Sequence, residues 1–141
     1  MQEALDLKKA FRKAGGPSVA IVHPRIGRGG SEARVMWGAE ALKEEFAVSI
    51  ISTGRIDLRQ LDEFYGTSTA GNSGIRVLSL PIPSYLTTHD SMAAMRGAFY
   101  QRALRRVIEN YTVAISAYNF ANFGMPGIHC LADFSWDENV R

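Results

Sequence analysis

Short apolar runs that alternate with longer segments of helical periodicity constrain the fold of this 141-residue chain more than any other feature. The runs predict five strands, at 18–22, 47–52, 75–80, 113–116 and about 127–131. The segments between them predict helices at about 31–46, 57–65 and 89–109, and a polar helix is expected at 2–13. This alternation favours a single α/β domain with a doubly wound, Rossmann-like parallel sheet.

Two of the predicted helices carry apolar side chains at spacings of three and four residues. In the helix at 31–46, the buried stripe is expected to comprise Val35, Gly38 or Ala39, Leu42 and Phe46. In the helix at 89–109, it is expected to comprise Met92, Met95, Phe99 and Ala103. The opposite face of that long helix would carry Arg102, Arg105 and Arg106. The Ser-, Thr- and Gly-rich segment 66–74 is predicted to be a mobile loop.

A glycine-rich turn joins the first strand to its helix, and it reads His23-Pro24-Arg25-Ile26-Gly27-Arg28-Gly29-Gly30-Ser31-Glu32. The N-terminus of a helix presents unpaired N–H groups and the positive end of the peptide dipoles, and glycines let a ligand approach the backbone closely. The residues predicted to bind a phosphate group there are Gly27, Arg28, Gly29, Gly30 and Ser31. The alternative is a plain tight turn that needs glycine only for its backbone angles.

The turn lacks the signatures of two common nucleotide-binding motifs. The dinucleotide fingerprint needs Gly-x-Gly-x-x-Gly, but Glu32 stands at the third glycine position. The second predicted strand ends in Ser52-Thr53-Gly54, without the carboxylate that would hold a ribose. Gly30 is followed by Ser31-Glu32, where the phosphate loop of triphosphatases has Lys and then Ser or Thr. A dehydrogenase is therefore a weak third hypothesis.

Ligands of parallel sheets bind at the carboxyl ends of the strands, where the strand order reverses. The glycine turn and the segment 117–124 both follow such strand ends, so both are expected to line one cleft. The cleft candidates are Arg25, His23, Tyr118, Asn119, Asn122 and His129. Each has a structural alternative: a hydrogen-bonded strand end for His23, a core residue for His129, a surface arginine for Arg25, packing for Tyr118, and turn residues for Asn119 and Asn122.

Two blocks of the sequence resemble retaining glycosyltransferases of family 4, which have the two-domain GT-B architecture. The first block is Ala20-Ile21-Val22-His23-Pro24-x-Ile26-Gly27-x-Gly29-Gly30-Ser31-Glu32. The second resembles members related to the lipid-linked oligosaccharide mannosyltransferases, and it is Ile115-Ser116-Ala117-Tyr118-Asn119-x-x-x-Phe123-Gly124-x-Pro126-Gly127-Ile128. The first block lies near the N-terminus of the chain, and the second lies near its C-terminus.

The resemblance implies the N-terminal, acceptor-side half of a GT-B enzyme. Such an enzyme moves a sugar, with mannose as the candidate, from a nucleotide-diphosphate sugar to a glycan or lipid-linked acceptor, and needs no further cofactor. In the family, Gly29 and Gly30 would close onto the donor phosphates. A C-terminal domain holds most of the donor, and it is missing from these 141 residues. The fragment alone is therefore expected to be inactive.

The composition of the chain limits which partners and which cellular compartment we expect for it. A net charge of +2 is too small to indicate nucleic acid, and three separated histidines with the single Cys130 offer no metal-binding spacing. The acidic N-terminus lacks the pattern of a signal peptide, and no apolar run reaches membrane-spanning length. We therefore expect a cytoplasmic protein. The arginines at 102–106 would either face solvent or contact anionic headgroups on the cytoplasmic face of a membrane.

A stand-alone α/β module that binds a phosphate ligand or docks a partner, without catalysis, is the alternative function. The surface of the cleft distinguishes the two hypotheses. A lost partner domain leaves an exposed apolar patch beside the cleft, whereas a self-contained module would have a polar, closed cleft.

Overall fold

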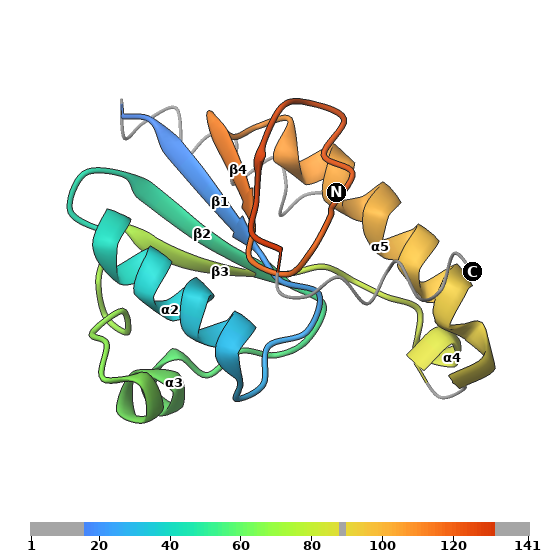
Figure 1. The fold of residues 1–141 in the computed structure, drawn as a ribbon, viewed down its shortest axis with the longest axis horizontal. Coiled ribbons are helices and arrows are strands. Elements are labelled where there is room, and N and C mark those ends of the chain that lie inside the picture. The colour runs from blue at the N-terminus through green and yellow to red at the C-terminus, as the bar shows by residue number, and fades with distance from the viewer. Residues whose placement is uncertain (1–15, 88–89, 132–141) are drawn as a thin grey trace.

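A computed structural model describes residues 16–87 and 90–131, which form a mixed α/β fold around a five-stranded, all-parallel sheet (Figure 1). The strands are β1 (Ser18–Val22), β2 (Ala47–Ser52), β3 (Ile75–Ser79), β4 (Val113–Ser116) and β5 (Ile128–His129). Their spatial order is β3-β2-β1-β4-β5, so the order reverses between β1 and β4. The predicted bounds of β1, β2 and β4 are confirmed, β3 ends one residue earlier, and β5 is only two residues long.

The helices are α2 (Gly30–Leu42), α3 (Leu58–Tyr65), α4 (Ser84–Thr87) and α5 (Ala93–Ile108), with a 3₁₀ turn, η1 (Asp90–Met92), before α5. The short α4 is not predicted from the sequence, and the helix predicted at 2–13 lies outside the described residues. None of the helices within 16–87 and 90–131 has both the length and the apolar character needed to span a membrane.

α2 ends at Leu42, four residues before the predicted end at Phe46. The chain needs these residues to reverse direction, because β2 begins at Ala47. The Phe46 N–H still donates to the Leu42 carbonyl at 3.0 Å. Both Leu42 and Phe46 pack against the core, so the predicted apolar stripe keeps its role although the helix stops sooner.

Alternate residues of β1 belong to two separate apolar clusters, one on each face of the sheet. Val19 and Ile21 belong to the cluster that contains Val35 of α2. Ala20 and Val22 belong to the cluster that contains Leu104 of α5. Helices therefore flank both faces of the sheet, which runs between α2 and α5 in Figure 1. All five residues of β1 are buried, as expected for a central parallel strand.

The predicted buried stripe of α5 is wrong for Met95 and Phe99, whereas Ala103 packs against the core as predicted. The buried residues are Tyr100, Leu104 and Ile108, whereas Met95 and Phe99 are 50% and 41% exposed. Two apolar stripes compete along this helix, and packing against β1 and β4 selects the one that starts at Tyr100. The basic face is consequently not opposite Met95 and Phe99. The spacing 95, 99, 102, 106 places these two residues on the same solvent-facing side of the helix as two exposed arginines.

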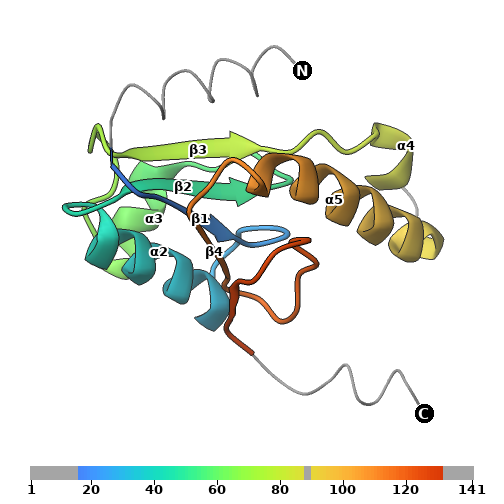
Figure 2. The same ribbon diagram turned by 90° about the horizontal axis from the view of Figure 1, so that it is seen from above.

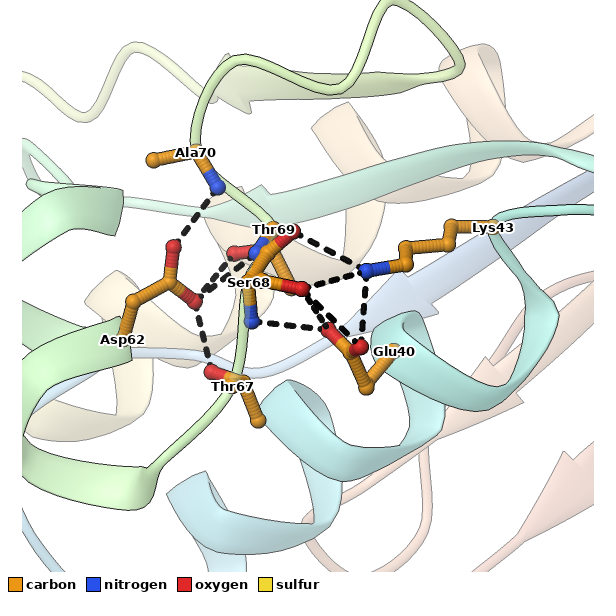
Figure 3. A network of polar contacts seen from close by, with 7 residues as sticks. All are labelled: Glu40, Lys43, Asp62, Thr67, Ser68, Thr69 and Ala70. Carbon is orange, nitrogen blue, oxygen red and sulfur yellow. Dashed lines mark hydrogen bonds and ion pairs between the residues drawn. The ribbon is translucent and has the colours of Figure 1, made fainter.

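The segment 66–74, predicted to be mobile, is fastened at its centre by Asp62 of α3 (Figure 3). The Asp62 carboxylate accepts four hydrogen bonds of 2.6–2.9 Å, from the Thr67 hydroxyl, the Thr69 N–H and hydroxyl, and the Ala70 N–H. Burial raises the pKa of Asp62, but these hydrogen bonds outweigh burial and hold the pKa below its ordinary value.

A second carboxylate, Glu40 of α2, holds the same segment from the other side (Figure 3). Glu40 accepts from the Ser68 N–H at 2.8 Å and from Lys43 Nζ at 2.7 Å. Lys43 Nζ also donates to the Ser68 carbonyl at 3.0 Å and to the Ser68 hydroxyl at 2.7 Å. Polar residues that suggest a flexible loop in the sequence instead tie α2 and α3 together.

Candidate functional site

The loops after β1 and β4 line one open cavity of about 640 Å³ at the carboxyl edge of the sheet. The two residues after β2 and the N-terminal half of α5 also line it. Figure 2 shows that α5 begins beyond the strand ends, on the side toward which the strand arrows point. The residues that carry its chemistry are Arg25, Thr53, Arg96, Gln101, Tyr118 and Asn119.

Arginine dominates the charge of this cavity. Arg25 from the β1 loop and Arg96 from α5 both line it, and none of the described residues that line it is acidic. Arg96 Nη1 donates to the Leu86 carbonyl at 2.8 Å, which fixes the guanidinium at the rim. Neither arginine forms an ion pair with another described residue. The cavity is therefore suited to an anion rather than to a cation.

Asn119 lines the cavity in a left-handed backbone conformation with φ of 52°, where asparagine is tolerated better than most residues. Its N–H donates to the Cys130 carbonyl at 3.2 Å, which joins the β4 loop to the residue after β5. Gln101 of α5 accepts from the Asn122 N–H at 2.8 Å and anchors the same loop. The loop that carries Asn119 and Tyr118 is thus attached at both sides.

The aromatic ring of Tyr118 connects the cavity to the glycine turn. Its centroid lies 5.3 Å from that of His23, with the rings tilted by 52°. Tyr118 is 41% exposed, whereas His23 is buried. The two sequence-predicted loops therefore meet at this ring pair, and Arg25 and Pro24 extend the contact into the cavity.

Residues 26–32 of the glycine turn do not line the cavity, and the polar groups of the turn bind one another. Ser31 Oγ donates to Glu32 Oε2 at 2.9 Å and accepts from His23 Nε2 at 3.0 Å. His23 Nδ1 accepts from the Arg25 N–H at 3.3 Å, so the ring is neutral with its proton on Nε2. Glu32 Oε1 accepts from the Gly27 N–H at 3.2 Å. The carboxylate of Glu32 thus occupies the start of its own helix.

Gly29 of the turn is held by Tyr65 at the end of α3. The Gly29 N–H donates to the Tyr65 hydroxyl at 2.7 Å, and that hydroxyl donates to the Gly29 carbonyl at 2.9 Å. A Cβ at position 29 would lie 2.8 Å from Glu32 Oε2, so a larger residue there would make this carboxylate shift. Arg28 stacks over the ring of Phe64, with Cζ 5.0 Å from the ring centroid.

The pKa values of His23 and Glu32 agree with this network. Burial lowers the pKa of His23 below its ordinary value, although the nearby charge of Glu32 opposes the change. Burial raises the pKa of Glu32, but hydrogen bonds from Ser31 and Gly27 outweigh it and lower the pKa overall. The turn therefore contains a neutral imidazole and an ionised carboxylate.

Three of the predicted cleft residues do not line the cavity: His23, whose bonds within the glycine turn are given above, and His129 and Asn122. His129 stacks on Phe123 with centroids 5.0 Å apart, and its Nδ1 accepts from the Ala121 N–H at 3.4 Å. Asn122 Oδ1 accepts from the Gly124 N–H at 3.2 Å and so closes its own turn. Both side chains hold the loop between β4 and β5.

Sequence reasoning missed the contribution of α5 and of the β2 end. Arg96, Gly97 and Gln101 line the cavity, as do Thr53 and Gly54. Thr53 and Gly54 could have been predicted to line the cavity, because they follow a predicted strand and so lie at the same sheet edge as the glycine turn. No local pattern identifies Arg96 and Gln101, because their role depends on where α5 crosses the sheet.

Comparison with models of known protein families, with curated proteins and with solved structures finds no match to this chain.

Proposed function

We propose that this chain is the acceptor-side domain of a retaining family 4 glycosyltransferase, with a doubly wound, GT-B type fold. The observation that supports this proposal is a set of exposed apolar side chains at the β4–β5 end of the sheet. Tyr118 and Phe120 line the cavity, and Ile128 and Leu131 lie in and just after the edge strand β5. A self-contained binding module would be expected to cover such side chains, whereas a two-domain enzyme covers them with its other domain.

In this proposal the start of α2 faces the diphosphate of the nucleotide sugar. The amides of Gly30 and Ser31, with Arg28 beside them, would stabilise the negative charge of the leaving group. A Cβ at Gly30 would have no atom within 4 Å, which leaves room for a close approach. Donor binding would displace the carboxylate of Glu32 or share its position, because Glu32 holds the neighbouring Gly27 N–H.

The sugar acceptor would occupy the cavity between the β1 loop, the β4 loop and α5. Cavities of roughly 300–1,000 Å³ bind small organic ligands, and this one falls within that range at about 640 Å³. Tyr118 offers an aromatic face for a sugar ring, and Asn119 and Gln101 offer amide groups for hydroxyls. The acceptor hydroxyl would then lie on the same sheet edge as the donor phosphates.

We also propose peripheral contact between α5 and an anionic membrane surface. Met95 and Phe99 are exposed beside Arg102 and Arg106, and this mixture of apolar and basic side chains is typical of helices that lie on lipid. Such contact would suit a lipid-linked acceptor, because it would hold the domain next to the bilayer in which that acceptor is anchored.

The second candidate is a stand-alone module that binds a phosphate ligand. It is favoured by the glycine turn, whose Gly27 and Gly29 N–H groups are already satisfied by Glu32 and Tyr65. These two N–H groups therefore do not need the phosphates of a donor substrate as hydrogen-bond acceptors. The arginine-lined cavity would then be the ligand site, without any reaction.

The reading frame beyond codon 141 provides the test. The proposal predicts a second Rossmann-like domain with a glutamate-bearing motif, and no sugar transfer by residues 1–141 alone. A stop codon, with no such partner encoded nearby, would favour the binding module. Robust sugar transfer by the 141-residue chain would contradict the division of roles between two domains.

A further inference from the structure

We propose that the carboxyl-edge cavity binds a sugar that carries an oxyanion, either a phosphate or a carboxylate. The cavity contains two arginines and, among the described residues lining it, no carboxylate. A neutral glycan would not need this charge, and a cation would be repelled by it. Charge-assisted hydrogen bonds from guanidinium groups are the usual way in which proteins hold phosphate and carboxylate groups.

The two arginines come from different elements and converge on the same space. Arg25 extends from the loop after β1, and Arg96 stands on the first turn of α5 with one N–H committed to the Leu86 carbonyl. That bond fixes the position of Arg96, and no other acceptor among the described residues pairs with its remaining donors. Ala93 also lines the cavity, so the positive end of the α5 dipole adds to the field of the arginines.

Gly97 keeps this space open at a cost to helix stability. It lies inside α5, where glycine is less favourable than alanine, and its backbone does not require glycine. A Cβ at this position would meet no atom within 4 Å. Gly54, which follows β2 and also lines the cavity, is equally unobstructed. Side chains at these positions would project from the cavity walls, so the glycines preserve its volume.

The remaining walls suit a sugar ring rather than a bare anion. Tyr118 and Phe120 present exposed aromatic rings, and Asn119 and Gln101 bring amide groups to the same lining. Aromatic faces and amides together match the apolar ring faces and the hydroxyls of a carbohydrate. The identification of this ligand as the acceptor rests on the proposed function, whereas its binding to the cavity does not.

Isothermal titration of the 141-residue chain tests the proposal with four probes: mannose 6-phosphate, glucuronate, methyl α-mannoside and inorganic phosphate. We expect at least one of the two anionic sugars to bind about tenfold or more tightly than methyl α-mannoside and inorganic phosphate. The stronger of the two distinguishes phosphate from carboxylate. Arg25→Gln should weaken that binding about tenfold, whereas Arg59→Gln at an exposed position on α3, outside the cavity lining, should leave it unchanged.

Gly97→Leu provides a second variant that separates binding from folding. Leucine favours a helix more than glycine does, so the thermal unfolding temperature should not fall, while its side chain should abolish binding. The proposal is overturned if the anionic sugars bind no better than methyl α-mannoside, or if Gly97→Leu binds them as wild type does. Sugar transfer by the complete gene product to a neutral acceptor, without anionic-sugar binding, would contradict this inference but not the proposed function.

Discussion

The carboxylate of Glu32 accepts the backbone N–H of Gly27 at 3.2 Å, so the first turn of α2 carries its own anion. The sequence pattern suggests a vacant phosphate site at this position, and the structure places a charged side chain there. Any phosphate ligand of the turn must therefore share the positive end of the helix dipole with Glu32 and compete with it for the Gly27 N–H.

Replacement of Glu32 by glutamine should strengthen the binding of a diphosphate to the turn. Glutamine can keep the hydrogen bond to Gly27 but removes the competing charge, which corresponds to about a two- to fivefold gain in affinity. Titration with inorganic diphosphate measures the effect. Glu45→Gln, at an exposed position beyond the far end of α2, is the matched control and should change nothing. Unchanged or weaker binding by Glu32→Gln would refute the phosphate role of the turn.

Replacement of Asp62 by alanine should release the segment 67–70. The variant leaves the Thr69 and Ala70 N–H groups without their acceptor, which should cost about 1–3 kcal/mol of unfolding free energy. Hydrogen exchange at those two amides should accelerate, whereas Glu63→Ala, an exposed neighbour, should leave it unchanged. Equal exchange rates in both variants would show that the carboxylate does not fasten the segment.

The same carboxylate should contribute to the loss of stability in acid. Its folded-state pKa lies below the ordinary value of 3.8, so the unfolded chain takes up the proton first as the pH falls. The contribution of Asp62 is therefore complete above pH 3.8 and is lost below it. Denaturant unfolding of wild type and of Asp62→Asn between pH 5 and pH 3 measures this contribution. The same dependence of unfolding free energy on pH in both proteins would contradict it.

His23 should make the stability depend on pH nearer to neutrality. Burial lowers its pKa below 6.5, so its contribution is complete above that pH and is lost as the pH falls through the folded-state pKa. The unfolding free energy can change by about 1.4 kcal/mol per pH unit through this one group. His23→Gln can still donate to Ser31 but cannot be protonated, and its unfolding curve should be flatter between pH 7 and pH 5. An equally steep curve would mean that His23 is not the titrating group.

The outer face of α5 should bind anionic lipid. Arg102→Gln and Arg106→Gln should each weaken binding to anionic phospholipid vesicles by about fivefold, the equivalent of ~1 kcal/mol per arginine near the surface. Arg59→Gln, an exposed arginine on α3, serves as the control. Sedimentation with anionic and with neutral vesicles gives the comparison, and equal binding to both would exclude the electrostatic contact.

The sheet was predictable because its strands are short apolar runs with clear ends. β1 is buried on both faces, and its run Ser18–Val22 stops where Pro24 and the glycines begin. The buried stripe of α5 was not predictable, since both Met95-Phe99 and Tyr100-Leu104 have helical spacing and the choice depends on contacts with the sheet. The hydrogen bonds that hold the segment 66–74 were not predictable for a related reason, because Asp62 and Glu40 bind it from other elements.

The site was predictable only in its location. Parallel topology alone brings the β1 and β4 loops to one edge, and the His23–Tyr118 contact lies there. Sequence reasoning could not show that Glu32 and Tyr65 would satisfy Gly27 and Gly29, because these bonds depend on side-chain geometry. It also could not identify Arg96, whose part in the cavity follows from the position of α5 across the sheet.

Sugar transfer by the complete gene product tests the proposed function most directly. Incubation with a panel of nucleotide sugars and candidate acceptors should release nucleoside diphosphate only when an acceptor is present. An α-linked donor should give an α-linked product, and Asn119→Ala in the cavity should reduce the rate. If no donor is cleaved while the same preparation binds an anionic sugar through the cavity, the protein is a binding module and the glycosyltransferase proposal is wrong.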